Sequence, residues 1–469
     1  MLTFQDFEKE ADRATFIYKA IQEHMGSPMC KTARDADLYD RQRNVTINEY
    51  VRTIFTLTGT PVEDFTASNA KLASNFFHRL NTQRCMYSLG NGLSFTRKEE
   101  RMDENGKTVT VDLTKQVLGD HFDTDIKDAG YKALIHGVSF CFWNVDQMYV
   151  FPLTNFVPLW DEDTGALRAG IRFWRLAPDK PLIAVLYEES GYTKYKSAGD
   201  GDDSLKPVHT RKSYKTNVQF VPATGEESVM GEENYGSLPI VPLWGSKLRQ
   251  STLIGMRQKI DSFDLIRSGF ANDLSDCAQI YWIVENCGGM SDGELQQFRD
   301  RMRINHIAVA DTDNGGKITP YTQEIPYQAR KTYLDDIRAG IYEDFGGLDV
   351  HTVAAGATND HIDAAYQPMD EEADDFEYQI IECVQQILKL IGIEDTPIFK
   401  RNRISNQKEQ VDMVIAEAPY LDDETILQKL PNISVDEIQD ILARREAQAQ
   451  ERMEEEQEEE QDEDSIPTE

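Results

Sequence analysis

One stretch, from Ser246 to Ile391, constrains the fold more than any other: it reads as three amphipathic helices separated by a β-rich insert and a Gly/Ala/Thr loop. In each helix the apolar residues recur at steps of three and four, which places them in one stripe on one face. The stripes are Leu253, Met256, Ile260, Phe263, Ile266, Phe270, Leu274 and Cys277 in the first helix, Leu334, Ile337, Ile341 and Phe345 in the second, and Met369, Phe376, Ile380, Val384, Ile387 and Ile391 in the third. Each stripe is narrow and the opposite faces are heavily charged. We therefore expect these helices to pack against neighbours, copies of the same chain included.

The ends of the three helices are marked in the sequence. The first helix is predicted to end near Asp276, and Gly346-Gly347 to stop the second, because glycine readily takes the left-handed conformation that closes a helix. Pro368 is predicted to kink the third helix in its first turns, because proline lacks the amide proton of a helical hydrogen bond.

The insert, residues 277–325, combines both kinds of secondary structure. Gln279–Val284 is aromatic and β-branched and predicts a strand, while Ser291 with Glu294 forms the pattern of a capping box at the start of a short helix. Asp313-Asn-Gly-Gly316 is a hairpin turn signal. The insert should therefore join two helices that run antiparallel.

Before this block the chain is first helical and then β-rich. Helices are predicted over residues 2–24, 31–39, 68–90 and 120–136. Short β-branched and aromatic runs begin at Val138 and are separated by Gly- and Asp-rich turns, which predicts an antiparallel array of strands. The expected fold class is α+β.

Length and composition set broad limits. At 469 residues with 40% hydrophobic residues the chain is long enough for two to four folded domains. It has neither a signal-peptide pattern nor an apolar run of bilayer length, so we expect a soluble, non-secreted protein. The six cysteines show no metal-ligand spacing and are expected to be buried thiols.

The net charge of −33 is spread over the chain, with a concentrated tail. Residues 451–469 contribute −10, which leaves −23 on residues 1–450. The Glu/Gln-rich end, residues 446–469, has too little apolar surface to offset the entropy of ordering and is expected to be disordered. Such a surface repels nucleic acid unless basic groups gather locally. Two modest basic clusters are candidates for phosphate or acidic-partner contact: Arg299, Arg301 and Arg303, and Lys400, Arg401 and Arg403.

The motifs of catalysis are weak in this sequence. Gly315-Gly316-Lys317-Ile318 lacks the upstream glycine and the hydroxyl residue of a phosphate-binding loop. The acidic residues of the third helix, among them Asp370 and Asp374, follow one another along one helix instead of converging from separate elements, so a solvated face explains them better than a two-metal nuclease. His136 is expected to be a core histidine, and His351 and His361 make a poor metal pair.

The order of several short motifs resembles the portal proteins of tailed double-stranded DNA bacteriophages, in particular those of phages with long, non-contractile tails. The motifs occur in the family's order over most of residues 40–395. They are Tyr131-Lys-Ala-Leu-Ile-His-Gly137, Ile171-Arg-Phe-Trp174, Ile260-Asp-Ser-Phe263 through Ala271-Asn-Asp-Leu274, Ile325-Pro-Tyr-Gln-Ala-Arg330, Ile341-Tyr-Glu-Asp-Phe-Gly346 and Ala355-Gly-Ala-Thr-Asn-Asp360.

The resemblance implies a non-enzymatic ring, usually of twelve subunits, at one capsid vertex of the virion, assembled in the host cytoplasm. Double-stranded DNA would be packaged and ejected through its channel. The implied partners are the terminase large subunit, a head–tail adaptor protein, and the major capsid and scaffolding proteins; no membrane and no cofactor are implied.

The resemblance also divides the chain. Residues 1–245 would form the wing, 246–276 and 326–346 the two stem helices, 277–325 the clip and 347–360 the tunnel loop. Residues 361–393 would form the long kinked wing/channel helix and 394–450 the helical crown, with 451–469 as the acidic tail. The implied DNA-facing residues of the tunnel loop are Val350, His351, Thr352, Val353, Thr358 and Asn359. The implied adaptor- and terminase-docking residues of the clip are Arg299, Arg301, Arg303, Asp313, Asn314 and Lys317.

Two other functions remain open on the residues alone. One is a metal-dependent nucleic-acid enzyme that uses the acidic third helix. The other is an acidic scaffold or DNA-mimic protein that binds a basic partner through residues 446–469. An acidic channel fits the ring, because like charge lets DNA slide without binding. Salt limits the electric field of the channel to about 8 Å, so it acts on DNA only in a narrow bore.

Overall fold

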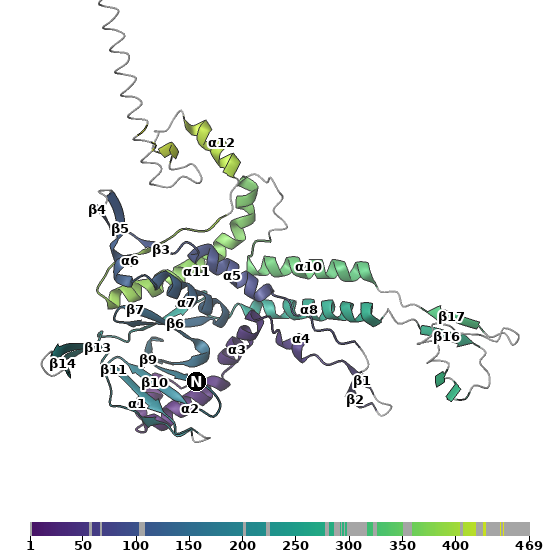
Figure 1. Cartoon of the computed structure of the whole chain (residues 1–469), viewed down its shortest axis with the longest axis horizontal. Coiled ribbons are helices and arrows are strands. Elements are labelled where there is room, and N and C mark those ends of the chain that lie inside the picture. Colours follow the sequence, from purple (N-terminus) through teal and green to yellow (C-terminus); the bar gives the residue numbers. More distant parts are fainter. Residues whose placement is uncertain are drawn as a thin grey trace, which may run out of the picture. The chain divides into compact units, whose positions relative to one another are not determined.

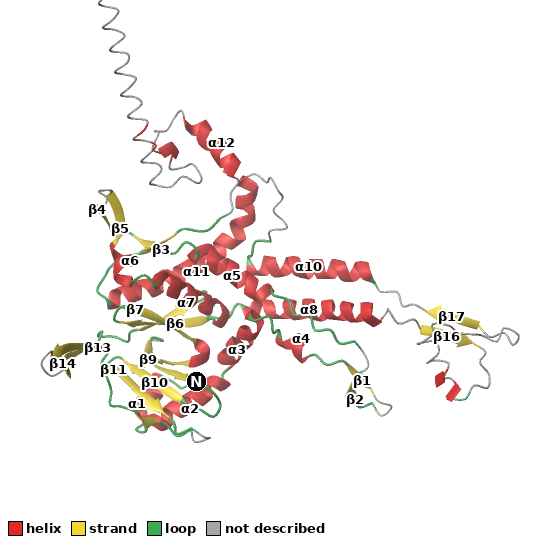
Figure 2. Cartoon of the chain, in the orientation of Figure 1, coloured by secondary structure: helices red, strands yellow, loops and turns green. Residues whose placement is uncertain are grey.

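The structure, a computed structural model, describes residues 2–55, 59–65, 68–102, 108–199, 203–221, 226–276, 281–285, 291, 293–294, 296–297, 317–321, 326–349, 359–403, 407–418, 425–427, 441 and 444. The chain divides into two compact units. The first comprises Met1–Gly347 and Glu372–Arg401, and the second Leu348–Glu371 and Asn402–Glu469. Helices and several small antiparallel sheets make up the described residues, which confirms the α+β class (Figure 2).

The helices before the first sheet follow the prediction in part. They are α1 Phe4–Lys9, α2 Arg13–Gly26, α3 Pro28–Asp40, α4 Val45–Glu49, α5 Phe76–Leu89, α6 Leu113–Leu118 and α7 Phe122–His136. The single helix predicted over residues 2–24 is wrong. The side chain of Asp12 accepts hydrogen bonds from the amides of Ala14 and Thr15, which starts a second helix at that point.

Two antiparallel sheets form the β-rich part. The larger has the order β12-β11-β10-β9-β8, and the smaller the order β15-β6-β7. Their strands are β6 Val138–Asn144, β7 Gln147–Pro152, β8 Phe156–Trp160, β9 Leu167–Trp174, β10 Ile183–Glu188, β11 Gly191–Lys196, β12 Lys206–Pro207 and β15 Ile240–Trp244. A 3₁₀ turn, Leu153–Asn155, connects the two sheets. The predicted antiparallel array is thus confirmed, and only β15 returns from far along the sequence to pair with β6.

Four two-stranded ladders lie among the other described residues of the first unit, and a fifth ladder joins distant parts of the chain. They are β1 Thr53–Phe55 with β2 Pro61–Glu63, β4 Lys98–Met102 with β5 Thr108–Asp112, β13 Lys215–Val221 with β14 Glu226–Glu233, and β16 Tyr281–Glu285 with β17 Lys317–Tyr321. The fifth pairs β18 Pro397–Phe399 with β3 Leu93–Phe95.

The three central helices are present. They are α8 Leu253–Asp276, α10 Tyr327–Phe345 and α11 Asn359–Leu390, and α12 Gln407–Glu417 follows them. The first helix is described as far as Asp276, and the predicted strand after it is confirmed as β16. Pro368 lies inside α11.

The insert is described only in part. The amide of Ser291 donates to the carboxylate of Glu294 at 2.8 Å, which is one of the two bonds of the predicted capping box. The hydroxyl of Ser291 donates to the same carboxylate at 2.9 Å. The hairpin turn predicted at residues 313–316 lies outside the described residues. So does the whole of the predicted disordered end, residues 446–469.

One core surrounds α7. Buried side chains of α7, of β6 and of the second half of α11, such as Phe122, Trp143 and Phe376, form its centre. His136 is buried in this region and its Nε2 lies 2.9 Å from Asp37 Oδ1, so the predicted core histidine is confirmed. The four described cysteines, Cys30, Cys85, Cys141 and Cys383, are buried free thiols, as predicted. Of the described helices, none is long and apolar enough to cross a bilayer.

Candidate functional site

The two helices that are predicted to form the stem, α8 and α10, lie side by side and antiparallel (Figure 1). We use the name stem for this helix pair. Lys259 Nζ donates to the carbonyl of Gly340 at 3.1 Å and lies 2.5 Å from Asp344. Toward the other end Arg330 pairs with Asp273, and the ring of Phe270 lies 5.9 Å from that of Tyr327. The antiparallel return predicted for the two helices is confirmed.

The end of α10 is a defined cap. Gly346 takes the left-handed conformation, with φ +64°, and its amide donates to the carbonyl of Glu343. The amide of Gly347 donates to the carbonyl of Tyr342 at 2.9 Å. These two bonds make a Schellman motif, which directs the chain away from the helix axis. The predicted stop at this glycine pair is therefore confirmed.

The apolar stripe of the stem is covered at one end and uncovered at the other. On α8, Leu253, Met256, Ile260 and Phe263 are buried, whereas Leu274 is 56% exposed. On α10 the buried residues are Ile341, Tyr342 and Phe345, whereas Tyr327 and Tyr333 are 53% and 47% exposed. The chain by itself thus leaves the apolar side chains farthest from the cap of α10 in contact with water, which costs free energy unless another surface covers them.

A second apolar surface that is exposed to water lies on the β1–β2 hairpin. The β1–β2 hairpin and its flanks carry Tyr50, Val51, Phe55, Val62 and Phe65, which we call the hairpin patch. Phe55 is 74% exposed and Phe65 is 84% exposed. Two nearly bare phenylalanines on one short hairpin are unusual for a surface that faces water alone. Sequence reasoning missed this patch, although the run Val51–Phe55 has the β-branched and aromatic composition of a strand.

An extended segment is fastened along α8 by side chains. The amides of Ala70, Leu72 and Ser74 donate to Asn272 Oδ1 at 2.6 Å, Ser268 Oγ at 3.0 Å and Asp264 Oδ1 at 2.9 Å. We call residues 68–75 the strap. The helix predicted over residues 68–90 is wrong in this half, because the polar face of α8 supplies the acceptors that a helix would have supplied internally. Only α5, Phe76–Leu89, is helical.

The acidic face of α11 is bound by arginines of the returning chain. In the first unit Arg401 makes two bonds of 3.0 Å to the carboxylate of Glu377 and also pairs with Asp374. In the second unit Arg403 pairs with Asp363 and Asp370. The hydrogen bonds that Arg401 donates to Glu377 raise its pKa above the ordinary value, so this cation stays charged.

This arrangement leaves the acidic face in contact with solvent, as expected, since the side chains of Asp374 and Asp363 are 70% and 65% exposed. It also shows that Arg401 and Arg403 of the second basic cluster are engaged within the chain. Among the described residues no three His, Cys, Asp or Glu side chains gather so that they could hold a metal ion. The described part of α11 therefore offers a nuclease no metal centre.

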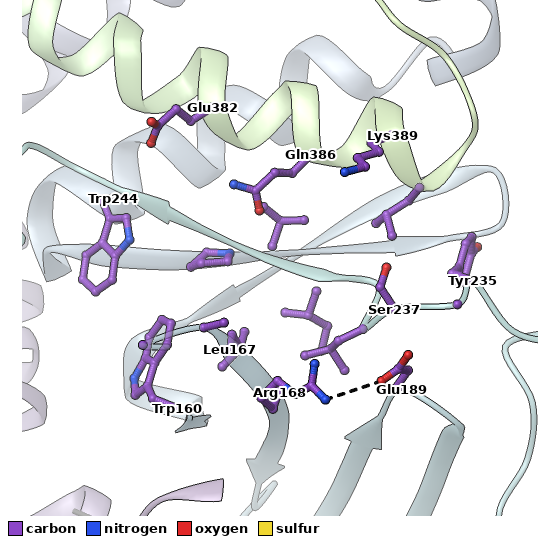
Figure 3. A pocket seen from close by; sticks show the side chains of 18 of the residues that line it. Trp160, Leu167, Arg168, Glu189, Tyr235, Ser237, Trp244, Glu382, Gln386 and Lys389 are labelled. Carbon is purple, nitrogen blue, oxygen red and sulfur yellow. Dashed lines mark ion pairs between the residues drawn. The ribbon is translucent and has the colours of Figure 1, made fainter. Parts of the chain in front are cut away.

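The open cavity in Figure 3 has a volume of about 810 Å³ and lies between α11 and strands β8, β9 and β15. Trp160 and Trp244 stack with their centroids 5.8 Å apart, and Glu382, Gln386 and Lys389 of α11 face the space. Arg168 on the opposite wall pairs with Glu189 at 4.0 Å. The described residues that line it include no His, Cys or Asp.

Most residues predicted to form functional sites lie outside the described residues. These are Val350, His351, Thr352, Val353 and Thr358 of the tunnel loop, and Arg299, Arg301, Arg303, Asp313 and Asn314 of the clip. Asn359 is the first residue of α11, and Lys317 is the first residue of β17. Their predicted roles stay predictions.

Comparison with known proteins identifies relatives across most of the sequence. The family model described as "Phage portal protein, SPP1 Gp6-like" matches residues 31–463. The portal protein of Clostridium phage phiCD119 is 28% identical over 215 residues, which cover 44% of this chain and about half, 48%, of that relative. The portal protein of Bacillus phage SPP1 is 23% identical over 427 residues, 86% of this chain and 79% of the relative.

Proposed function

Because the chain belongs to the phage portal protein family, whose model covers residues 31–463, we propose that its copies close into a ring around a DNA channel. Double-stranded DNA would be packaged into the capsid through this channel and ejected through it. That extended match is the observation that carries the proposal. Phage portal proteins form a structural family of virion components, and both relatives are named portal proteins.

The uncovered apolar side chains support self-association. Leu274, Tyr327 and Tyr333 of the stem and the hairpin patch would gain contact area from a neighbouring copy. A ring of identical subunits uses the same two surfaces at every contact, so each copy is covered on both sides. We propose a ring of usually twelve subunits.

Each part of the chain would have its own role in the ring. The stem helices α8 and α10 would line the ring below the wing, and residues 277–325 would form the clip that docks the head–tail adaptor and the terminase large subunit. Arg299, Arg301, Arg303 and Lys317 would meet the partners there. Residues 347–360 would face DNA as the tunnel loop, residues 394–450 would form the crown, and the major capsid and scaffolding proteins would surround the wing.

The negative charge suits conduction. A net charge of −33 for each subunit gives the ring a strongly acidic surface, which disfavours tight DNA binding. The chain would hydrolyse nothing itself, and a separate motor would supply the energy.

Electron microscopy and native mass spectrometry of the purified chain test the proposal. We expect annular particles with a central opening and a mass about twelve times the 53.5 kDa of one chain. A monomer that stays compact and monodisperse at micromolar concentration, with no opening, would contradict it.

A further inference from the structure

Arg84 is a buried cation that contacts both α10 and α11. Between these two contacts the chain leaves the first unit and then returns to it. It lies on α5, and its side chain is 7% exposed. One guanidinium nitrogen donates to the carbonyl of Phe345, the last residue of α10. Another lies 3.0 Å from the carboxylate of Glu372 on α11. The segment between these contacts, Leu348–Glu371, belongs to the second unit.

The contact with Phe345 is shielded from water and combines two interactions. The guanidinium carbon of Arg84 lies 4.0 Å from the centroid of the Phe345 ring, which adds a cation–π contact to the hydrogen bond. The Schellman motif uses the carbonyls of Tyr342 and Glu343, and Arg84 satisfies that of Phe345.

Gly347 fits this close packing. A Cβ atom at that residue would come within 2.5 Å of Leu80 Cδ2, one helical turn before Arg84 on α5.

The contact with Glu372 is different in kind. The side chain of Glu372 is 47% exposed, so water can replace Arg84 as its partner. Burial lowers the pKa of Arg84, and the charges of Glu372 and Asp375 oppose that effect. The same guanidinium thus makes one shielded bond to the end of α10 and one bond to α11 that water can reach.

We propose that Arg84 is a positioning residue for DNA passage: it fixes Glu372 of α11 relative to Phe345 of α10, the residues beside the two ends of the segment Leu348–Glu371. The inference rests on the proposed portal function, because that segment includes most of the tunnel loop. Breaking the bond to Glu372 removes the tie that Arg84 makes to α11 and keeps the tie that it makes to Phe345.

Substitution of the exposed partner tests this without disturbing the buried one. In Glu372→Gln the charge is lost, and the protein keeps Arg84 with its bond to Phe345. We expect ring assembly to be unchanged, and amide exchange of residues 359–371 to rise about threefold, the size of losing a partly exposed ion pair. Exchange at residues 341–349 should stay slow. Procapsids built with this variant should package less DNase-protected DNA for each particle than the wild type.

Glu371→Gln is the matched control. Glu371 is the neighbouring acid, accepts a bond from Gln367 at 3.4 Å, and should leave both measurements at the wild-type level. Arg84→Lys keeps the charge but loses the planar fork, and we expect it to raise exchange at both 341–349 and 359–371. If Arg84→Lys fails to fold, the comparison of Glu372→Gln with Glu371→Gln still tests the positioning role of Arg84.

The outcomes separate this inference from the portal function. Unchanged exchange in Glu372→Gln overturns the positioning role, and so does raised exchange with normal packaging. If the wild-type chain forms no ring and supports no packaging, the proposed function fails instead, whatever the exchange data show.

Discussion

Asp264 shows how a single buried carboxylate fastens distant segments together. It is fully buried on α8, where one oxygen accepts the amide of Ser74 at 2.9 Å and the other accepts the side-chain amide of Asn44. Burial raises its pKa above the ordinary value of 3.8, and the hydrogen bonds from Asn44 and Ser74 only partly oppose this. The charged form is therefore tolerated only because both oxygens have donors.

We expect Asp264→Ala to destabilise the chain by about 2–4 kcal/mol, because it leaves the donors of Asn44 and Ser74 buried and unpaired. Asp264→Asn keeps one acceptor and should cost about half as much. A carboxyl whose folded pKa is raised favours folding most at acid pH and loses that contribution as pH rises from 3.8 through the folded pKa. The stability gap between wild type and Asp264→Asn should therefore shrink as pH rises.

Thermal unfolding of both variants over a pH series measures these differences. Asp146→Asn, in the exposed turn between β6 and β7, serves as a control for loss of one carboxylate. Equal stability of Asp264→Ala and wild type would show that the strap gains nothing from this acceptor.

At the scale of elements, the strap depends on a match between two repeats. Successive acceptors on α8 are four residues apart, which is about 6 Å along a helix, and successive donors in the strap are two residues apart, about 6.6 Å in an extended chain. The two spacings agree closely enough for three consecutive bonds. The four-residue spacing of these acceptors in the sequence of α8 has a meaning only when the strap is known to be their partner.

The strap predicts an alternating pattern of amide protection. Ala70, Leu72 and Ser74 should exchange slowly, because their amides are bonded to α8. Ser268→Ala should speed exchange at Leu72 about fivefold, the size of one ordinary hydrogen bond, and leave Ala70 and Ser74 protected. Residue-resolved hydrogen exchange measures this. Equal loss at all three amides would instead mean that the strap detaches as a unit.

The cap of α10 gives a second prediction at this scale. Gly346→Ala should lower stability by about 1 kcal/mol, because φ at Gly346 is +64° and a side chain is strained there. Gly269→Ala is the matched substitution in the interior of α8, where a Cβ would meet nothing within 4 Å. It should raise stability by about 0.5–1 kcal/mol through helix propensity. Thermal unfolding compares the two, and a loss of stability in both would contradict this account.

For the whole molecule, the question is which surface another copy covers. Phe55 and Phe65 are the most exposed aromatic residues of the hairpin patch. Burying one phenylalanine is worth about 2–3 kcal/mol. A contact that covers both in every subunit would therefore stabilise a ring strongly.

We expect the double variant Phe55→Ser, Phe65→Ser to keep the thermal stability of the isolated chain within about 0.5 kcal/mol, because these side chains are exposed. Its rings should dissociate at protein concentrations at least tenfold higher than wild-type rings. Native mass spectrometry across a dilution series measures this. Leu176→Ser, at a residue 89% exposed in the turn between β9 and β10, is the control and should assemble normally. Wild-type assembly by the double variant would exclude the hairpin patch from the interface.

The sequence by itself determined the elements whose signals are local. The apolar period of α8, the glycine stop after Phe345 and the strand after Asp276 all depend on neighbours within a few residues, so they could be predicted. The order of short motifs also indicated the portal family that the comparison then showed.

Only the tertiary structure decided which distant partners meet. The strap lies about two hundred residues from α8 in sequence, Arg84 lies 261 residues from Phe345, and Arg401 turns back onto α11. Local propensity favours a helix over the strap, but it carries no information about acceptors supplied by a helix elsewhere in the chain. Those bonds form only when the chain has folded, and they hold the stem, α5 and α11 together.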